Sequence, residues 1–69
     1  MARNRQIIRT WRIVRELSVA GRTFNALAED LGVTTRTVRR DIEALEEAGF
    51  PLVQDEQRRW RVFDRKELA

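Results

Sequence analysis

Residues 27–49 read LAEDLGVTTRTVRRDIEALEEAG, and this stretch decides the predicted fold. An apolar face with the i, i+3, i+4, i+7 spacing of a helix is formed by Phe24, Leu27, Ala28 and Leu31. Gly32 then ends this helix, because glycine adopts the left-handed conformation without steric cost. Thr34 is predicted to cap a second helix by accepting a hydrogen bond from a free backbone N–H. The stretch therefore predicts two helices joined by a tight turn, a helix-turn-helix.

The second helix, predicted over residues 35–48, carries its informative chemistry on its outward face. A step of about 100° per residue from the buried Val38 places Arg36 and Arg40 on the side away from the core. Arg36 lies three and four residues from Arg39 and Arg40, and each such like-charge pair costs an isolated helix roughly 0.2–0.5 kcal/mol. Positive charge in the first turns also opposes the helix dipole. An anionic partner relieves both effects, whereas a solvated helix face leaves the crowding unexplained.

Length and composition restrict the class of protein. Sixty-nine residues form one small domain that buries only about 60% of its unfolded surface. The chain has no cysteine and no histidine, which excludes disulfides and any conventional zinc site built from these residues. No apolar run approaches the roughly 18 residues of a membrane span, and the N-terminus has no signal-peptide hydrophobic region. We therefore expect a cytoplasmic protein without cofactors or membrane contact.

Charge is distributed in blocks along the chain. Residues 1–40 hold nine arginines against three acidic residues, and residues 41–57 hold six acidic residues and no basic one. Residues 58–69 return to a surplus of three positive charges, with five basic residues against two acidic ones. This separation predicts one basic and one acidic surface, the pattern of a nucleic-acid binder.

A first helix is predicted from about Asn4 to Val19, and it is apolar over more than half of its circumference. Its expected central stripe consists of Ile7, Trp11, Val14 and Ser18, with Leu17 beside them. Ile8 and Ile13 lie off that stripe, so the helix either packs under the other elements on several sides or contacts another subunit or domain. The helix also carries four arginines at helical spacing, Arg5, Arg9, Arg12 and Arg15. Contact with a phosphate backbone and simple exposure to solvent explain them about equally well.

A β-hairpin is predicted near the C-terminus, from strands at residues 52–54 and 58–63. Trp60 is interpreted as a cover on the core in preference to a base-stacking platform. Arg58 and Arg59 flank the hairpin tip, where they could contact phosphate or the minor groove. Closer to the N-terminus, Thr23 and Phe24 are expected to form a short third strand before a helix capped by Asn25. We expect Asp41 to pair with Arg22 or with an arginine of the first helix.

This order of elements is that of a winged helix-turn-helix, mostly α with a small hairpin wing. The string LAEDLGVTTRTVRRDIEALEEAGFPLV resembles the N-terminal DNA-binding domain of DeoR-type and WYL-domain bacterial transcription regulators. The residues that match that family's motif are Thr34, Thr37, Val38, Arg39, Arg40, Asp41, Ile42, Leu45, Glu46 and Gly49. The wing sequence RRWRV departs from the family, whose wing more often carries glycine and tyrosine. The resemblance implies a recognition helix in the major groove, dimeric binding to repeated half-sites, and an effector domain beyond a linker.

We therefore expect a domain at residues 1–63 that binds double-stranded DNA specifically, and a linker or tail at 64–69. The expected parent is a homodimeric regulator, with the isolated domain a monomer. Arg36 and Arg40 are expected to contact base edges. The full set of expected DNA contacts is Thr34, Thr35, Arg36, Thr37, Arg39, Arg40, Arg58 and Arg59. Enzyme activity is disfavoured, because the sequence has no His, Cys or Tyr, its one serine is Ser18, and it has no glycine-rich phosphate loop. The alternative is a winged helix for protein–protein contact or RNA binding.

Overall fold

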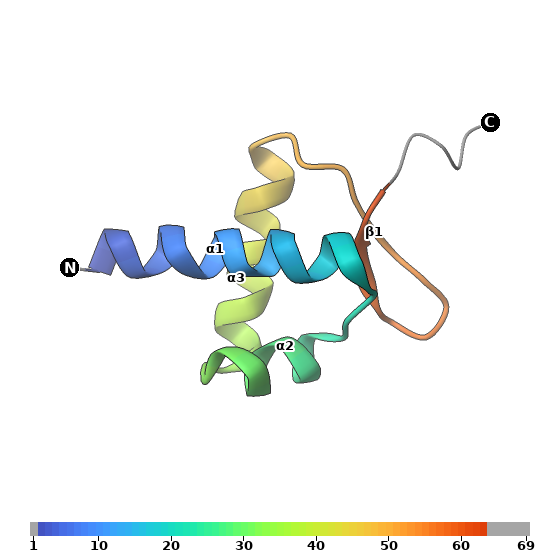
Figure 1. Ribbon diagram of the computed structural model, residues 1–69, viewed down its shortest axis with the longest axis horizontal. Coiled ribbons are helices and arrows are strands. Elements are labelled where there is room, and N and C mark those ends of the chain that lie inside the picture. Colours follow the sequence, from blue (N-terminus) through green and yellow to red (C-terminus); the bar gives the residue numbers. More distant parts are fainter. Residues whose placement is uncertain (1, 64–69) are drawn as a thin grey trace.

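In the computed structural model, helices α1 and α2 pack against α3, and strand β2 of the hairpin packs against α1 (Figure 1). The structure describes residues 2–63, with side chains from residue 5 onward, so the predicted tail at 64–69 lies outside the described residues. The helices are α1 (Ala2–Val19), α2 (Phe24–Leu31) and α3 (Thr35–Glu47), and the strands are β1 (Leu52–Gln54) and β2 (Trp60–Val62). Three helices followed by an antiparallel hairpin make a winged helix-turn-helix, which confirms the predicted fold class.

The hydrophobic core is small and draws on every described element except β2. Its buried members are Ile13, Leu17, Leu27, Ala28, Val38, Ile42, Leu45 and Leu52. Trp60 and Val62 of β2 are half-buried and pack against this core, as predicted for a cover. The helical spacing of the predicted stripes on α2 and α3 therefore places them correctly on the inside.

The buried face of α1 differs from the predicted stripe. Ile13 and Leu17 are almost completely buried, whereas Ile7 and Trp11 are 55% and 62% exposed. The prediction was wrong because a helix that is apolar on most sides gives no unique inward direction. The observed rotation buries Ile13 and Leu17 and turns Arg9 toward α3, where it reaches Asp41.

Arg9 and Asp41 form a bidentate ion pair between α1 and α3. The guanidinium donates to both carboxylate oxygens, with 3.1 Å between Nη2 and Oδ1. The Asp41 side chain is 1% exposed and that of Arg9 is 22% exposed. Hydrogen bonding to Asp41 raises the pKa of the Arg9 guanidinium, so the guanidinium remains charged. A helix-1 partner for Asp41 is thus confirmed, while the other predicted partner, Arg22, pairs with Glu16 and Asp30 instead.

The helix-turn-helix is fixed by its caps. Gly32 ends α2 in the left-handed conformation with φ 68°, and Thr34 caps α3 by accepting a hydrogen bond from the N–H of Thr37. The start of α2 differs from the prediction, since Thr23 is its cap and the helix begins at Phe24. The Thr23 hydroxyl accepts a hydrogen bond from the Ala26 N–H, so Thr23 has the capping role that was expected of Asn25.

This difference in capping predicts a difference in stability. Replacing Thr23 with alanine should lower the free energy of unfolding by about 1 kcal/mol, because an N–H of the first turn loses its partner. Replacing Asn25 with alanine serves as the matched control and should cost less than half as much. Urea denaturation followed by circular dichroism measures both values. Equal costs at the two positions would contradict the assignment of the cap.

The hairpin forms the wing, and its register pairs Leu52 with Val62 and Gln54 with Trp60. The second strand is shorter than predicted and covers residues 60–62. The expected strand at Thr23 and Phe24 is absent. Backbone hydrogen bonds between Arg22 and Trp60 form an isolated bridge there, so the chain meets the wing just before α2 begins.

Candidate nucleic-acid interface

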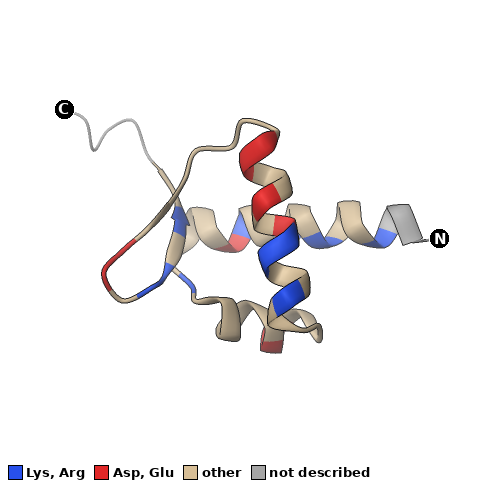
Figure 2. Cartoon of the chain, turned by 180° about the vertical axis from the view of Figure 1, so that it is seen from behind, with Lys and Arg blue, Asp and Glu red and all other residues tan. Residues whose placement is uncertain are grey.

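The outward face of α3 is divided into a basic and an acidic half. Arg36, Arg39 and Arg40 are exposed on its N-terminal half, and none of the three forms an ion pair with a residue that the structure describes. The C-terminal half carries Glu43 and its acidic neighbours (Figure 2). A polyanion in contact with this face would therefore be attracted to the first two turns and repelled from the last.

The threonines at the start of α3 have different surroundings. The hydroxyl of Thr34 accepts from the backbone N–H of Thr37 at 3.2 Å and lies 3.1 Å from the hydroxyl of Thr37. These two side chains are therefore engaged in capping the helix. Thr35 is exposed and lines the groove described next.

An open groove lies between the N-terminal ends of α2 and α3 and the wing. Its polar lining includes Asn25, Thr35, Arg39, Gln57 and Arg58. Two guanidinium groups together with hydroxyl and amide groups are the donors that contact nucleic-acid phosphates. The groove thus joins the basic half of α3 to the wing in one surface.

Arg39 is held toward this groove by aromatic side chains. Its guanidinium carbon lies 5.7 Å from the centre of the Phe24 ring, the distance of a cation–π contact. Phe24 in turn stacks on Trp60 of the wing, with 5.7 Å between ring centres. Arg39 therefore belongs to the groove, whereas Arg36 and Arg40 lie on the central outward surface of α3.

The tip of the wing is a tight loop built around Asp55. Its carboxylate accepts hydrogen bonds from the backbone N–H groups of Gln57 and Arg59, and from Arg59 Nε at 2.9 Å. Arg58 between them adopts a left-handed φ of 64°, which is uncommon for a residue with a side chain. The loop thus presents Arg58 toward the groove and keeps Arg59 beside Asp55.

These hydrogen bonds lower the pKa of the Asp55 carboxyl below its ordinary 3.8, chiefly through the Arg59 backbone N–H. Because the folded state favours the ionised carboxyl, this group contributes to the stability of the folded protein above its ordinary pKa. That contribution is lost as the pH falls through the lowered pKa. We expect the amide resonances of Gln57 and Arg59 to shift together below pH 3.8 in an NMR titration. In the variant Asp55→Ala this shared transition should be missing. A midpoint at or above the ordinary value in the native protein would contradict the loop geometry.

Six of the eight predicted contact residues lie on one surface formed by α3, its cap and the groove. Those six are Thr34, Thr35, Arg36, Thr37, Arg39 and Arg40. Arg58 joins them through the groove, and Arg59 lies at the wing tip, 51% exposed, in its ion pair with Asp55. Sequence reasoning missed Asn25 and Gln57 as lining residues, because three separate elements meet at the groove and no local pattern connects them.

The fold and this basic surface define a helix-turn-helix domain, and comparison with protein families agrees. A family model described as HTH domain matches residues 3–58, which is most of the chain. The chain therefore belongs to the HTH domain family. Membership of this family, together with the basic half of α3, indicates DNA as the partner and a role in transcription regulation. No solved structure matches the chain significantly. Across residues 2–63, none of the helices has the length and apolar character needed to cross a bilayer.

Proposed function

We propose that this domain reads a specific sequence of double-stranded DNA as the N-terminal module of a bacterial transcription regulator of the DeoR or WYL type. The observation that supports it most is the set of exposed arginines over the first two turns of α3, which form no ion pair with any of residues 5–63. A structural role would favour glutamate among them, because like charges at this spacing repel. The proposal gives the domain no enzymatic role and places it in the cytoplasm, associated with the nucleoid.

In the proposed complex, α3 enters the major groove with its N-terminal half. Arg36 and Arg40 meet base edges, where arginine pairs bidentately with guanine O6 and N7. Arg39 and Arg58 bind phosphates from the groove between α3 and the wing. The wing, residues 54–61, lies along the backbone, and Asp55 at its tip prevents deeper insertion.

The proposed parent protein is a homodimer that binds repeated half-sites. A single domain of this size offers one helix to one half-site, so the isolated chain is expected to bind as a monomer and weakly. Dimerisation in the parent would raise affinity by presenting two domains at once, since linked binding sites act at a high effective concentration.

Fluorescence anisotropy across a salt series tests the electrostatic part of this proposal. Labelled duplex DNA should bind more tightly than single-stranded DNA or duplex RNA, and log K should fall linearly with log salt. The variant Arg58→Ala should reduce the slope by about 1, since one phosphate contact is lost. Arg15→Ala, on the far side of α1, is the matched control and should leave the slope unchanged. The absence of duplex binding even at low salt would reject the proposal in favour of a protein-contact role.

A further inference from the structure

Two hollows lie along α1, the helix that crosses α3 on the side opposite the outward arginines (Figures 1 and 2). One lies between α1 and the α2–α3 turn, with an apolar floor of Ile8, Leu31 and Val33. The other lies beside Val19 near the end of α1. Arg12 lines both hollows, and we name the two hollows together with the helix face between them the α1 groove.

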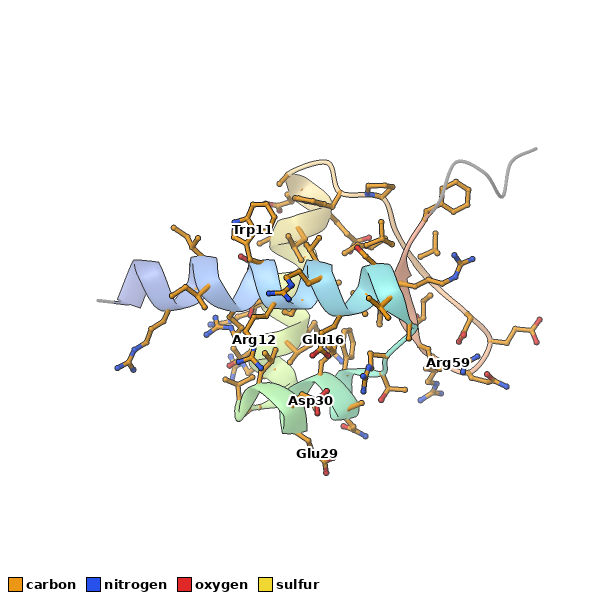
Figure 3. The ribbon with its side chains drawn as sticks, in the orientation of Figure 1. Trp11, Arg12, Glu16, Glu29, Asp30 and Arg59 are labelled. Atoms are coloured by element: carbon orange, nitrogen blue, oxygen red, sulfur yellow. The ribbon has the colours of Figure 1, made fainter. Side chains whose placement is uncertain are left out.

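The α1 groove is edged by a regular stripe of three arginines and two apolar residues. Its members are separated by three and four residues in turn and are Arg5, Ile8, Arg12, Arg15 and Val19. Such spacing keeps all five on one side of a helix. Ile8 is 61% exposed and Val19 is 87% exposed, while Trp11 lies on the other side of α1 from Arg12 (Figure 3). Apolar groups gathered on an exposed helix face are typical of a surface that another molecule covers.

The charge of this groove is unbalanced. Two of its arginines have partners within the fold, Arg9 with Asp41 and Arg22 with Glu16 and Asp30. Arg5, Arg12 and Arg15 form no ion pair with any residue in the described part of the chain. The surface therefore combines apolar contact area with three uncompensated positive charges.

Neither DNA bound to α3 nor a second copy of this chain suits the groove. Helix α1 crosses α3 on the side opposite the outward arginines, so a duplex on those arginines lies on the other side of the domain (Figures 1 and 2). A symmetric dimer through the groove would bring the same surface of both copies together. Arg5, Arg12 and Arg15, which have no ion-pair partner among the described residues, would then face three like charges, which is unfavourable.

We propose that the α1 groove binds an acidic amphipathic helix of a partner protein. Leucine-like side chains of the partner would enter the hollow over Leu31 and Val33, and its carboxylates would pair with Arg5, Arg12 and Arg15. The stripe extends over about 21 Å at 1.5 Å per residue, so a partner helix of about 14 residues covers it. DNA binding and partner binding then use opposite sides of the domain and proceed together.

The test uses a fluorescein-labelled 16-residue peptide with leucines at helical spacing on one face and glutamates beside them. Two comparison peptides carry lysine in place of glutamate, or the same residues in scrambled order. The acidic amphipathic peptide should bind at least tenfold more tightly than either. Arg12→Glu should weaken it at least tenfold and leave duplex DNA binding within twofold, and Ile8→Ser should weaken it without a change in charge.

The reciprocal variant is Arg40→Glu, which should lose DNA affinity and retain peptide affinity. Circular dichroism of each variant establishes that the fold is kept, and Ile8 and Arg12 are both exposed enough for substitution without unfolding. Equal binding of the three peptides would overturn the proposal. So would an Arg12→Glu variant that loses DNA as strongly as Arg40→Glu, or a native chain that dimerises through Ile8. Because each variant is measured against both ligands, failure of this inference is separate from failure of the proposed DNA binding.

Discussion

Replacing Arg9 with methionine is expected to lower the free energy of unfolding by about 3 kcal/mol. The substitution keeps most of the aliphatic stem but leaves the 1% exposed carboxylate of Asp41 without its cation. Breaking a buried ion pair by removing one partner costs about 3–5 kcal/mol, and the lower end applies because Arg9 is partly exposed. A domain of this size has a total stability of only about 3–10 kcal/mol. Much of the protein should therefore unfold at temperatures that the native chain tolerates.

Urea denaturation measures this effect, with Arg5→Met as the control. Arg5 lies one turn earlier on α1, is exposed, and forms no ion pair with a described residue, so its replacement should change stability by less than about 0.5 kcal/mol. The double variant Arg9→Met, Asp41→Leu should recover part of the loss, because no buried charge then remains unpaired. Equal stability of the two single variants would show that the ion pair does not hold α1 to α3.

Replacing Arg36 or Arg40 with alanine should cost about 1–3 kcal/mol of binding free energy on the preferred duplex and little on unrelated duplexes. Each proposed base contact distinguishes one base pair, so its loss removes preference at one position. Arg58→Ala is the comparison, and it should weaken binding to all duplexes alike because phosphates carry no sequence information. Competition anisotropy with single-base variants of the preferred site measures the three cases. Uniform losses in all three variants would remove Arg36 and Arg40 from the proposed base readers.

Much of the fold follows from local patterns in the sequence. Gly32 and Thr34 mark the turn by their backbone and capping chemistry, and the apolar spacing around Val38 fixes which side of α3 is buried. These signals are local, so no knowledge of the other elements is needed to interpret them. The hairpin after Pro51 was predicted for the same reason, from alternating residues and a polar turn.

The orientation of α1 and the shape of the groove between α2, α3 and the wing could not be predicted in this way. Ile7 and Ile13 are both apolar residues on the same helix, and which of them is buried depends on how α1 packs against α3 and β2. The roles of the arginines also depend on distant partners. Arg39 is drawn to Phe24, and Arg59 is held by Asp55, while Arg36 and Arg40 remain on the open face of α3.

Selection of bound duplexes from a random pool tests the central claim of sequence-specific DNA binding most directly. If α3 reads bases, the selected duplexes should share one short motif that contains guanines. Parallel selections with the Arg36→Ala and Arg40→Ala variants should each lose the preference at one of these guanines. A pool that stays random, although the native chain retains duplex in the same experiment, would contradict base reading by α3 and leave only non-specific attraction to the backbone.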